Sequence, residues 1–265
     1  MKRRCLSTCD IILTILGVAK FLQQCVWNIP AIFVLFSLRW TWMLNYSLLS
    51  IYTSMDLFSF WCAAWLYVFY FLKIVNSQHP LFLCLKSRLP SKLSWLLLGS
   101  VLVALVTGLP LPWIVYRSCH PMEAPTNDTS LVCYRPEVLS MLVLSYTLPF
   151  LIFSASATLL TASLCTHTRR MEDNSTGFSQ PNLDVHFRAV KTALAFLLVY
   201  IFYFIAVIDN TFDSSQNTFT VISFLVISSY PCVHSLLLIQ SNSKLRMTAI
   251  GILHRAKCRR VAGSS

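Results

Sequence analysis

The stretch FSFWCAAWLYVFYFLKIVNSQHPLFLCLKSRLP, residues 58–90, decides the fold class of this chain. Residues 57–72 carry no charge and are rich in aromatic side chains and leucine. The apolar run ends at Lys73, and a proline stop with further Lys and Arg follows it. An apolar helix of bilayer length that ends in basic residues is typical of a membrane helix leaving on the cytoplasmic side. We therefore use this segment to orient the rest of the chain.

The composition agrees with a membrane protein. Of the 265 residues, 56% are hydrophobic and only 12% are charged, whereas a soluble domain carries about 25% charged residues. A transmembrane β-barrel would show alternating segments of about ten residues, and the sequence has none. The net charge of +11 is better explained by Lys and Arg in cytoplasmic loops than by nucleic-acid binding. The sequence thus predicts an all-α polytopic membrane protein.

Six apolar segments, separated by polar or charged loops, predict six spans within one transmembrane domain, residues 1–265. The spans cover about residues 6–26, 45–72, 93–116, 138–165, 192–208 and 219–240, with a basic tail over 241–265. An even number of spans places both termini on the same side. If that side is the cytoplasm, it receives 17 of the 21 Lys and Arg, and the opposite side receives three. This asymmetry follows the positive-inside rule and supports cytoplasmic termini.

Several short motifs resemble one receptor family. Residues 69–74 (FYFLKI), with the His79-Pro80 pair that follows, resemble the third helix and second cytoplasmic loop of type 2 (bitter) taste receptors. Residues 6–24 (LSTCDIILTILGVAKFLQQ) resemble the second helix of that family, with Lys20 where the family usually has Arg. Residues 159–171, 186–200 and 230–245 are similar to the foot of the fifth helix, the start of the sixth, and the seventh helix with its exit. The motifs occur in the family's order and spacing.

This resemblance implies a G protein-coupled receptor of the plasma membrane. The family's fold would make the chain a six-helix bundle corresponding to helices 2 to 7 of a seven-transmembrane receptor. It would sense bitter small molecules in an outward-facing pocket and signal through a heterotrimeric G protein. The chain resembles a form lacking the family's first helix, so we expect Lys20 and Asn242 to lose polar neighbours and the protein to be compromised in cells.

Other functions were weighed beside this one. Six spans and an intramembrane charge are compatible with a small transporter or channel, although the sequence lacks the repeats or paired midplane charges expected there. A non-functional truncated receptor is a further alternative. No metal-ligand, nucleophile or phosphate-loop motif is present, so we predict no enzyme activity, no cofactor and no metal.

The predicted ligand site lies on the second span. Tyr52, Asp56, Ser59 and Ala63 recur at helical spacing and share one face. By the resemblance, Asp56 falls where bitter receptors often have Asn on the third helix, and we expect it to line the ligand pocket. A carboxylate there would attract cationic ligands, and the alternative is a hydrated aspartate near the membrane interface. We therefore predict ligand contacts from Tyr52, Asp56 and Ser59.

Two further polar sites lie inside the predicted membrane region. Lys20 is near the middle of the first span, where a charge costs about 2.5 to 3.5 kcal/mol. We expect it to face the bundle and bond to backbone carbonyls or to polar residues of the sixth span. His234 and Ser235 lie near the inner end of the last span, where they form either a switch or a simple interhelical hydrogen bond.

The cytoplasmic helix ends carry the predicted G-protein contacts. Tyr70, Lys73, His167 and Lys191 occupy matching family positions, and the resemblance implies that these helix ends surround the docking cleft. Anchoring of the basic residues to lipid headgroups is the alternative explanation.

The predicted topology also assigns modifications. Of the N-x-S/T sequons, Asn127 lies within an outer loop and is predicted to carry glycan, Asn45 is too close to the membrane, and Asn174 is cytoplasmic and bare. Cys119 and Cys133 share the same outer loop, where the surroundings are oxidising. A disulfide there would contribute about 3 kcal/mol, and both the paired and the free states remain open.

Overall fold

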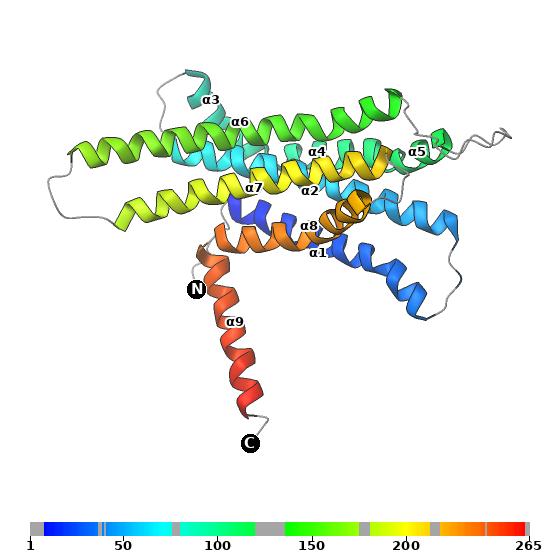
Figure 1. Ribbon diagram of the computed structural model, residues 1–265. Coiled ribbons are helices and arrows are strands. Elements are labelled where there is room, and N and C mark those ends of the chain that lie inside the picture. Colours follow the sequence, from blue (N-terminus) through cyan, green and yellow to red (C-terminus); the bar gives the residue numbers. More distant parts are fainter. Residues whose placement is uncertain are drawn as a thin grey trace.

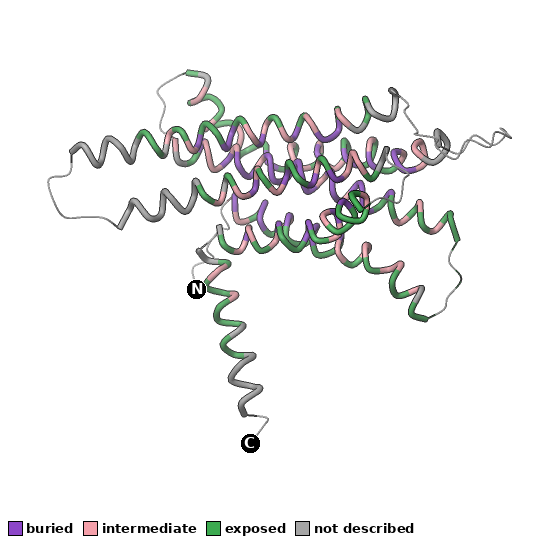
Figure 2. Tube along the Cα trace, in the orientation of Figure 1, coloured by how far each residue is buried: buried purple, intermediate pink, exposed green. Residues whose placement is uncertain are grey.

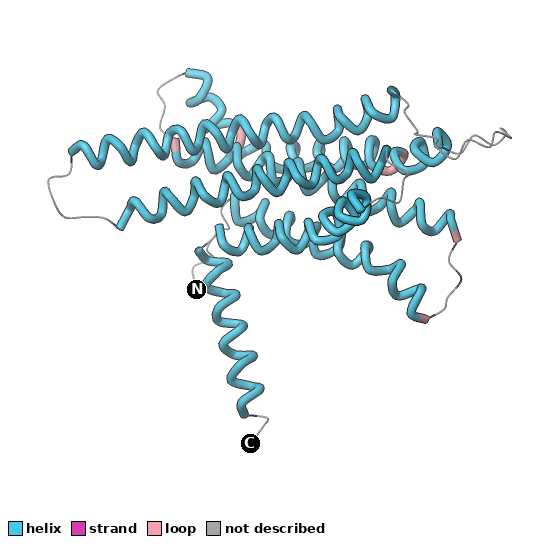
Figure 3. The backbone as a smooth tube through the Cα atoms, viewed as in Figure 1, coloured by secondary structure: helices cyan, strands magenta, loops and turns pink. Residues whose placement is uncertain are grey.

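The computed structural model describes residues 8–36, 39, 41–75, 80–119, 136–174, 181–212, 218–241 and 243–262. These residues are helical almost throughout and include no strand (Figures 1 and 3). The helices are α1 (Thr8–Leu35), α2 (Trp42–Ile74), α3 (Pro80–Arg88), the 3₁₀ turn η1 (Pro90–Lys92), α4 (Leu93–Gly108), α5 (Leu111–Cys119), α6 (Pro136–Asn174), α7 (Pro181–Phe212), α8 (Thr218–Ser241) and α9 (Ser243–Ala262).

The long helices lie side by side and form a bundle (Figure 1). Helix α2 packs against α1, α4 and α6, and the bundle continues through contacts of α7 with α8 and of α8 with α1. Burial is greatest along α2, and Figure 2 shows the buried residues gathered in the middle of the bundle. Helix α9 leaves the end of α8 and projects away from the bundle (Figure 1).

The described helices confirm an all-α membrane bundle. Five apolar segments are long enough to cross a bilayer: Thr8–Phe33, Trp42–Lys73, Pro90–Val115, Val143–Ser163 and Thr218–Gln240. A shorter apolar helix, Leu194–Asn210, lies within α7. Each of these six segments overlaps one of the six predicted spans.

The third predicted span is broken, which the uninterrupted apolar run did not indicate. Helix α4 ends at Gly108, and α5 begins at Leu111 after a turn. Pro110 and Pro112 provide the reason, because neither has the N–H group that an α-helix needs at its position. Beyond the turn, α5 contacts both α2 and α6.

Two segments predicted as loop or tail are largely helical. The charged segment 169–191 belongs to the loop predicted between the fourth and fifth spans, but α6 continues to Asn174 and α7 starts at Pro181. The basic tail contains α9. Arg, Lys, Met, Glu and Ala are good helix formers, so these helices continue beyond the apolar residues that suggested the span boundaries.

Gly108 allows α4 to approach α2 closely. A Cβ atom at this position would lie 2.6 Å from the Cα atom of Ser54 on α2. Side-chain carbons do not approach backbone atoms so closely, so a larger residue would push the two helices apart. Glycine is therefore required here for packing and not for a special backbone angle.

The buried apolar residues form two clusters along the bundle. One contains the start of α1 and the second half of α2, with Ile12, Leu66 and Phe69 among its members. The other is rich in tyrosine and includes Tyr146 and Tyr203. The polar site described next lies at this tyrosine-rich cluster.

Candidate functional site: a cavity above a buried ion pair

A cavity of about 650 Å³ opens at one end of the bundle. We call this the cavity end, and it is where α1 finishes, α2 starts and α5 lies. The volume is in the range of small-molecule sites. Its wall is mainly aromatic and aliphatic, with a few amide and hydroxyl groups. The lining residues are Trp27, Asn28, Pro30, Ala31, Asn45, Tyr46, Leu49, Tyr52, Thr53, Leu111, Pro112, Val115, Tyr146, Tyr203, Val207, Asn210, Phe224 and Ile227.

Two tyrosines of the cavity wall bond to a buried carboxylate. The hydroxyl groups of Tyr146 on α6 and Tyr203 on α7 donate to Oδ2 of Asp56 at 3.3 Å and 2.5 Å. Asp56 lies on α2 and is fully buried. The carboxylate therefore sits behind the cavity wall and joins three helices.

The other oxygen of Asp56 receives two donors from α1. Lys20 Nζ lies 3.2 Å from Oδ1 in a buried ion pair, and Gln23 Nε2 donates to the same oxygen at 2.8 Å. Lys20 also donates to Gln23 Oε1 at 2.9 Å. Because Lys20 and Gln23 are three residues apart, they lie on one face of α1 and reach Asp56 together. We refer to Lys20, Gln23, Asp56, Tyr146 and Tyr203 as the polar cluster.

Aromatic rings surround the charged atoms of the polar cluster. Lys20 Nζ lies 4.4 Å from the ring centre of Tyr230 on α8 and 5.5 Å from that of Phe60 on α2. Rings at these distances attract a cation through their electron-rich faces. Lys20 is thus satisfied by a carboxylate, an amide and aromatic faces, which compensates the cost of burying its charge.

Tyr52 connects the cavity to a proline in α8. Pro231 has no N–H, so the carbonyl of Ile227, four residues earlier, loses its usual helical partner. The hydroxyl of Tyr52 lies 3.5 Å from that oxygen and can replace the missing donor. The ring of the same tyrosine packs at a tilt against Trp27 of α1, with 4.9 Å between ring centres and 45° between the ring planes. Tyr52 thus links α1, α2 and α8 at the cavity.

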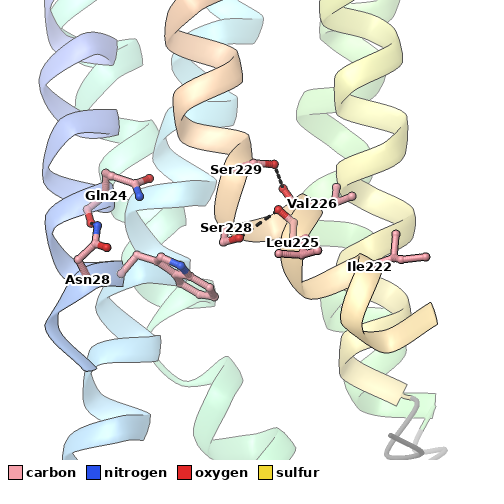
Figure 4. A pocket seen from close by; sticks show the side chains of 8 residues that line it. Gln24, Asn28, Ile222, Leu225, Val226, Ser228 and Ser229 are labelled. Atoms are coloured by element: carbon pink, nitrogen blue, oxygen red, sulfur yellow. Dashed lines mark hydrogen bonds between the residues drawn. The ribbon is translucent and has the colours of Figure 1, made fainter. Parts of the chain in front are cut away.

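A shallower hollow of about 510 Å³ lies beside the cavity, between α1 and α8. Figure 4 shows Gln24 and Asn28 on α1 on one side of it and Ser228 and Leu225 on α8 on the other. The two serine hydroxyls drawn there, Ser228 and Ser229, donate to carbonyls within α8. Asn28 and Trp27 belong to the walls of both spaces.

The structure rearranges the predicted ligand residues. Tyr52 lines the cavity, as its position suggested. Asp56 and Ser59 are buried and are not among the lining residues. Asp56 is neither a free carboxylate nor a hydrated one, because Lys20 pairs with it. The hydroxyl of Ser59 bonds to the carbonyl of Met55 within α2.

Lys20 also differs from its prediction. Its hydrogen-bond acceptors are Asp56 and Gln23, and not the backbone carbonyls or the polar residues of the sixth span that were expected. The sixth span contributes a ring, Tyr230. Because Lys20 is bonded to both Asp56 and Gln23, it does not lack polar partners, contrary to the expectation drawn from the family resemblance.

His234 and Ser235 lie on α8, farther from the cavity end than Tyr230. His234 is buried and its ring packs against Tyr230 and Phe196, at 5.6 Å and 5.1 Å between centres. Its Nδ1 atom has no hydrogen-bond partner among the described residues. Ser235 donates to the carbonyl of Pro231 in its own helix. Among the described residues, the bond of Ser235 therefore stays within α8 and His234 Nδ1 makes none, so the interhelical hydrogen bond considered from the sequence is not seen at these atoms.

The predicted G-protein residues map to the end opposite the cavity. Tyr70 is half-buried in the last turns of α2, and Lys73 is exposed in its final turn. Lys191 is exposed on α7. His167 falls within α6, but its side chain is outside the described residues. The ends of these helices lie on the same side of the bundle (Figure 1).

The predicted modification sites lie outside the described residues. Asn127 and Cys133 fall in the segment 120–135, and the side chain of Cys119 is likewise not described. Asn242 is also outside. The structure therefore leaves the glycan and the disulfide as predictions.

The sequence reasoning missed most of the polar cluster. Gln23, Tyr146 and Tyr203 were not singled out, although each lies within a predicted span. Gln23 had a usable signal, since it stands three residues after an intramembrane lysine. The tyrosines had none, because a tyrosine in an apolar helix is common and only the fold brings these two to Asp56.

Comparison with known proteins identifies the family. The family described as taste receptor protein (TAS2R) matches residues 1–257. Taste receptor type 2 member 40 of Gallus gallus is 32% identical over 276 residues, covering 97% of this chain and 88% of that protein. Taste receptor type 2 member 8 of Gorilla gorilla gorilla is 34% identical over 275 residues, covering 99% and 88%. Member 41 of Mus musculus is 32% identical over 250 residues, covering 90% and 81%. The motif resemblance is thereby confirmed, and the chain belongs to the type 2 taste receptors, a family of multi-pass G protein-coupled receptors and not of enzymes.

Proposed function

We propose that this chain is a plasma-membrane receptor for bitter small molecules that signals through a heterotrimeric G protein. One observation carries the proposal: two tyrosines of the cavity wall also bond to the buried ion pair that joins the helices. A ligand that moves Tyr146 or Tyr203 must therefore disturb contacts among α1, α2, α6 and α7.

The cavity is the proposed ligand site. It is enclosed by residues from α1, α2, α5, α6, α7 and α8, so a bound molecule would touch most of the bundle at once. Aromatic and aliphatic side chains offer apolar contacts, and amides at Asn28, Asn45 and Asn210 offer polar contacts. Such a mixture is common in small-molecule pockets.

A series of ring contacts leads from the cavity toward the opposite end. Tyr203 lies 4.1 Å from Tyr230, which contacts His234. His234 contacts Phe196, and Phe196 lies 6.0 Å from Tyr67, all between ring centres. Tyr67 in turn contacts Tyr70. We propose that ligand binding repacks these rings. Phe196 lies in the middle of this series, so its truncation should interrupt the repacking.

The end opposite the cavity is the proposed G-protein surface. Tyr70, Lys73, His167 and Lys191 are proposed contact residues. Lys73 and Lys191 are exposed there and offer positive charge to an acidic partner surface.

This assignment requires the cavity to face outward and both termini to face the cytoplasm. Asn127 would then be glycosylated and Asn174 would not. Endoglycosidase treatment of Asn127→Gln and Asn174→Gln variants tests the orientation. A mobility shift that disappears only in Asn174→Gln would invert it. In the same outer loop, Cys119 and Cys133 are either paired or free, and the mass of the unreduced peptide distinguishes the two states.

Calcium imaging tests the function. Cells expressing the chain with a G protein α subunit are exposed to a panel of bitter compounds, with untransfected cells as the control. We expect a concentration-dependent calcium rise for some of them. Phe196→Ala should weaken that response while compound-induced thermal stabilisation of the purified protein persists. Surface-expressed protein that answers none of the panel would refute the function.

A further inference from the structure

Building on the proposed function, we propose that the cavity selects uncharged ligands and that Lys20 is the residue that determines this selectivity. The sequence alone suggested the opposite, because Asp56 appeared available to attract a cation. The structure assigns that carboxylate to an internal partner, which removes its charge from the cavity.

The carboxylate of Asp56 has no free capacity to accept a ligand. A carboxylate offers about four acceptor positions. Oδ1 is used by Lys20 and Gln23, and Oδ2 by Tyr146 and Tyr203. A ligand amine would have to displace one of these donors. The two tyrosine side chains also stand between the carboxylate and the cavity, since they line it and Asp56 does not.

The described wall of the cavity carries no charged side chain. The ion pair behind it has a net charge of zero, because Lys20 compensates Asp56. A cation moved from water into such an enclosed site would lose its hydration without gaining a counter-ion, which is unfavourable. An uncharged aromatic molecule loses much less hydration free energy when it enters the cavity.

Amide groups give the cavity its polar specificity. Asn28 donates its side-chain N–H to the carbonyl of Gln24, which leaves its side-chain oxygen as an acceptor beside the cavity. Asn45 and Asn210 add further amides. The cavity therefore fits uncharged aromatic or alicyclic molecules that donate or accept a few hydrogen bonds.

One other carboxylate lies near the cavity in the described structure. Asp209 precedes the lining residue Asn210 on α7, and its Oδ2 atom is buried without a hydrogen-bond partner. Asp209 itself does not line the cavity. If the cavity attracts cations, Asp209 is the other carboxylate that could cause it, so Asp209→Asn serves as the control variant.

The experiment uses compounds in matched pairs, each an aromatic tertiary amine and the uncharged amide with the same ring system. Calcium responses are measured in cells expressing the full chain. We expect the amide to be at least tenfold more potent in most pairs that respond. Amines of equal or greater potency would overturn the inference and leave the proposed function standing. If neither these pairs nor other bitter compounds evoke a calcium response, the proposed function is overturned, and the inference with it.

Variants then test the role of Lys20. Lys20→Met leaves Asp56 uncompensated and should shift the potency ratio at least tenfold toward the amine. Lys20→Met combined with Asp56→Asn should restore the preference for the amide, and Asp209→Asn should leave the wild-type ratio unchanged. A ratio that moves with Asp209→Asn would assign charge selectivity to Asp209 and contradict the proposal. If Lys20→Met does not reach the cell surface, the wild-type panel still decides whether the cavity prefers uncharged ligands.

Discussion

Separating the two charges of the polar cluster should destabilise the bundle strongly. Lys20 Nζ and Asp56 Oδ1 are 3.2 Å apart and almost completely buried. At that distance, with an effective dielectric constant of about 20, the attraction is about 5 kcal/mol. Removing one partner leaves an uncompensated buried charge, which costs about 3 to 5 kcal/mol. We expect Lys20→Met and Asp56→Asn each to lower the free energy of unfolding by that amount.

The double variant Lys20→Met/Asp56→Asn separates pairing from local packing. It removes both charges, so its loss should be at least about 2 kcal/mol smaller than the sum of the two single losses, as expected for interacting residues. Thermal unfolding of the purified protein in lipid nanodiscs measures all three, with the exposed Lys92→Met as control. The ion pair would be refuted if the two single losses were strictly additive in the double variant. It would also be refuted if each single loss were below about 0.5 kcal/mol, which is the range of ordinary surface substitutions.

Three further substitutions follow from the packing and from the proposed signalling surface. Gly108→Ala should destabilise the protein by about 1 to 3 kcal/mol through overpacking against Ser54. Gly17→Ala is the control, because a Cβ atom at position 17 would meet nothing within 4 Å, and it should stabilise the protein by about 0.5 to 1 kcal/mol. Thermal unfolding compares the two variants, and equal effects would contradict the close approach of α4 to α2. Tyr52→Phe removes a long hydrogen bond to Ile227 and should cost only about 0.6 kcal/mol, so a loss above about 2 kcal/mol in the same assay would show a larger role. Lys191→Glu should reduce the calcium response without changing the compound-induced thermal shift, and an unchanged response would remove Lys191 from the proposed G-protein surface.

The fold class was predictable because hydrophobicity alone determines it. Long uncharged runs with few polar residues can only be helices in a membrane, so the approximate positions of the spans followed from the sequence. The first and last residues of the helices could not be predicted in the same way. Helix α6 runs to Asn174 and α7 begins at Pro181, since helix formation depends on local propensity and not on lipid contact. The break after Gly108 was readable in principle from Pro110 and Pro112, but the long apolar run concealed it.

The site was predictable only in part. Lys20 and Asp56 were recognisable one by one, because a charge inside a membrane segment is unusual. The ion pair between them could not be predicted, since they are 36 positions apart and the sequence does not show which faces of α1 and α2 meet. Because of this contact, the ligand that we propose is uncharged and not cationic as the sequence suggested.

The most direct measurement of the central claim is a test of cavity occupancy. Val207 lines the cavity on α7, and a tryptophan there would fill part of it. Leu236 on α8 is 60% exposed on the bundle surface, so Leu236→Trp adds the same side chain outside the cavity. Calcium responses to the active bitter compounds are compared at equal surface expression. The account predicts that Val207→Trp abolishes the response or raises the effective concentration at least tenfold, while Leu236→Trp responds like the unmodified chain. A full response from Val207→Trp would show that ligands do not bind in this cavity.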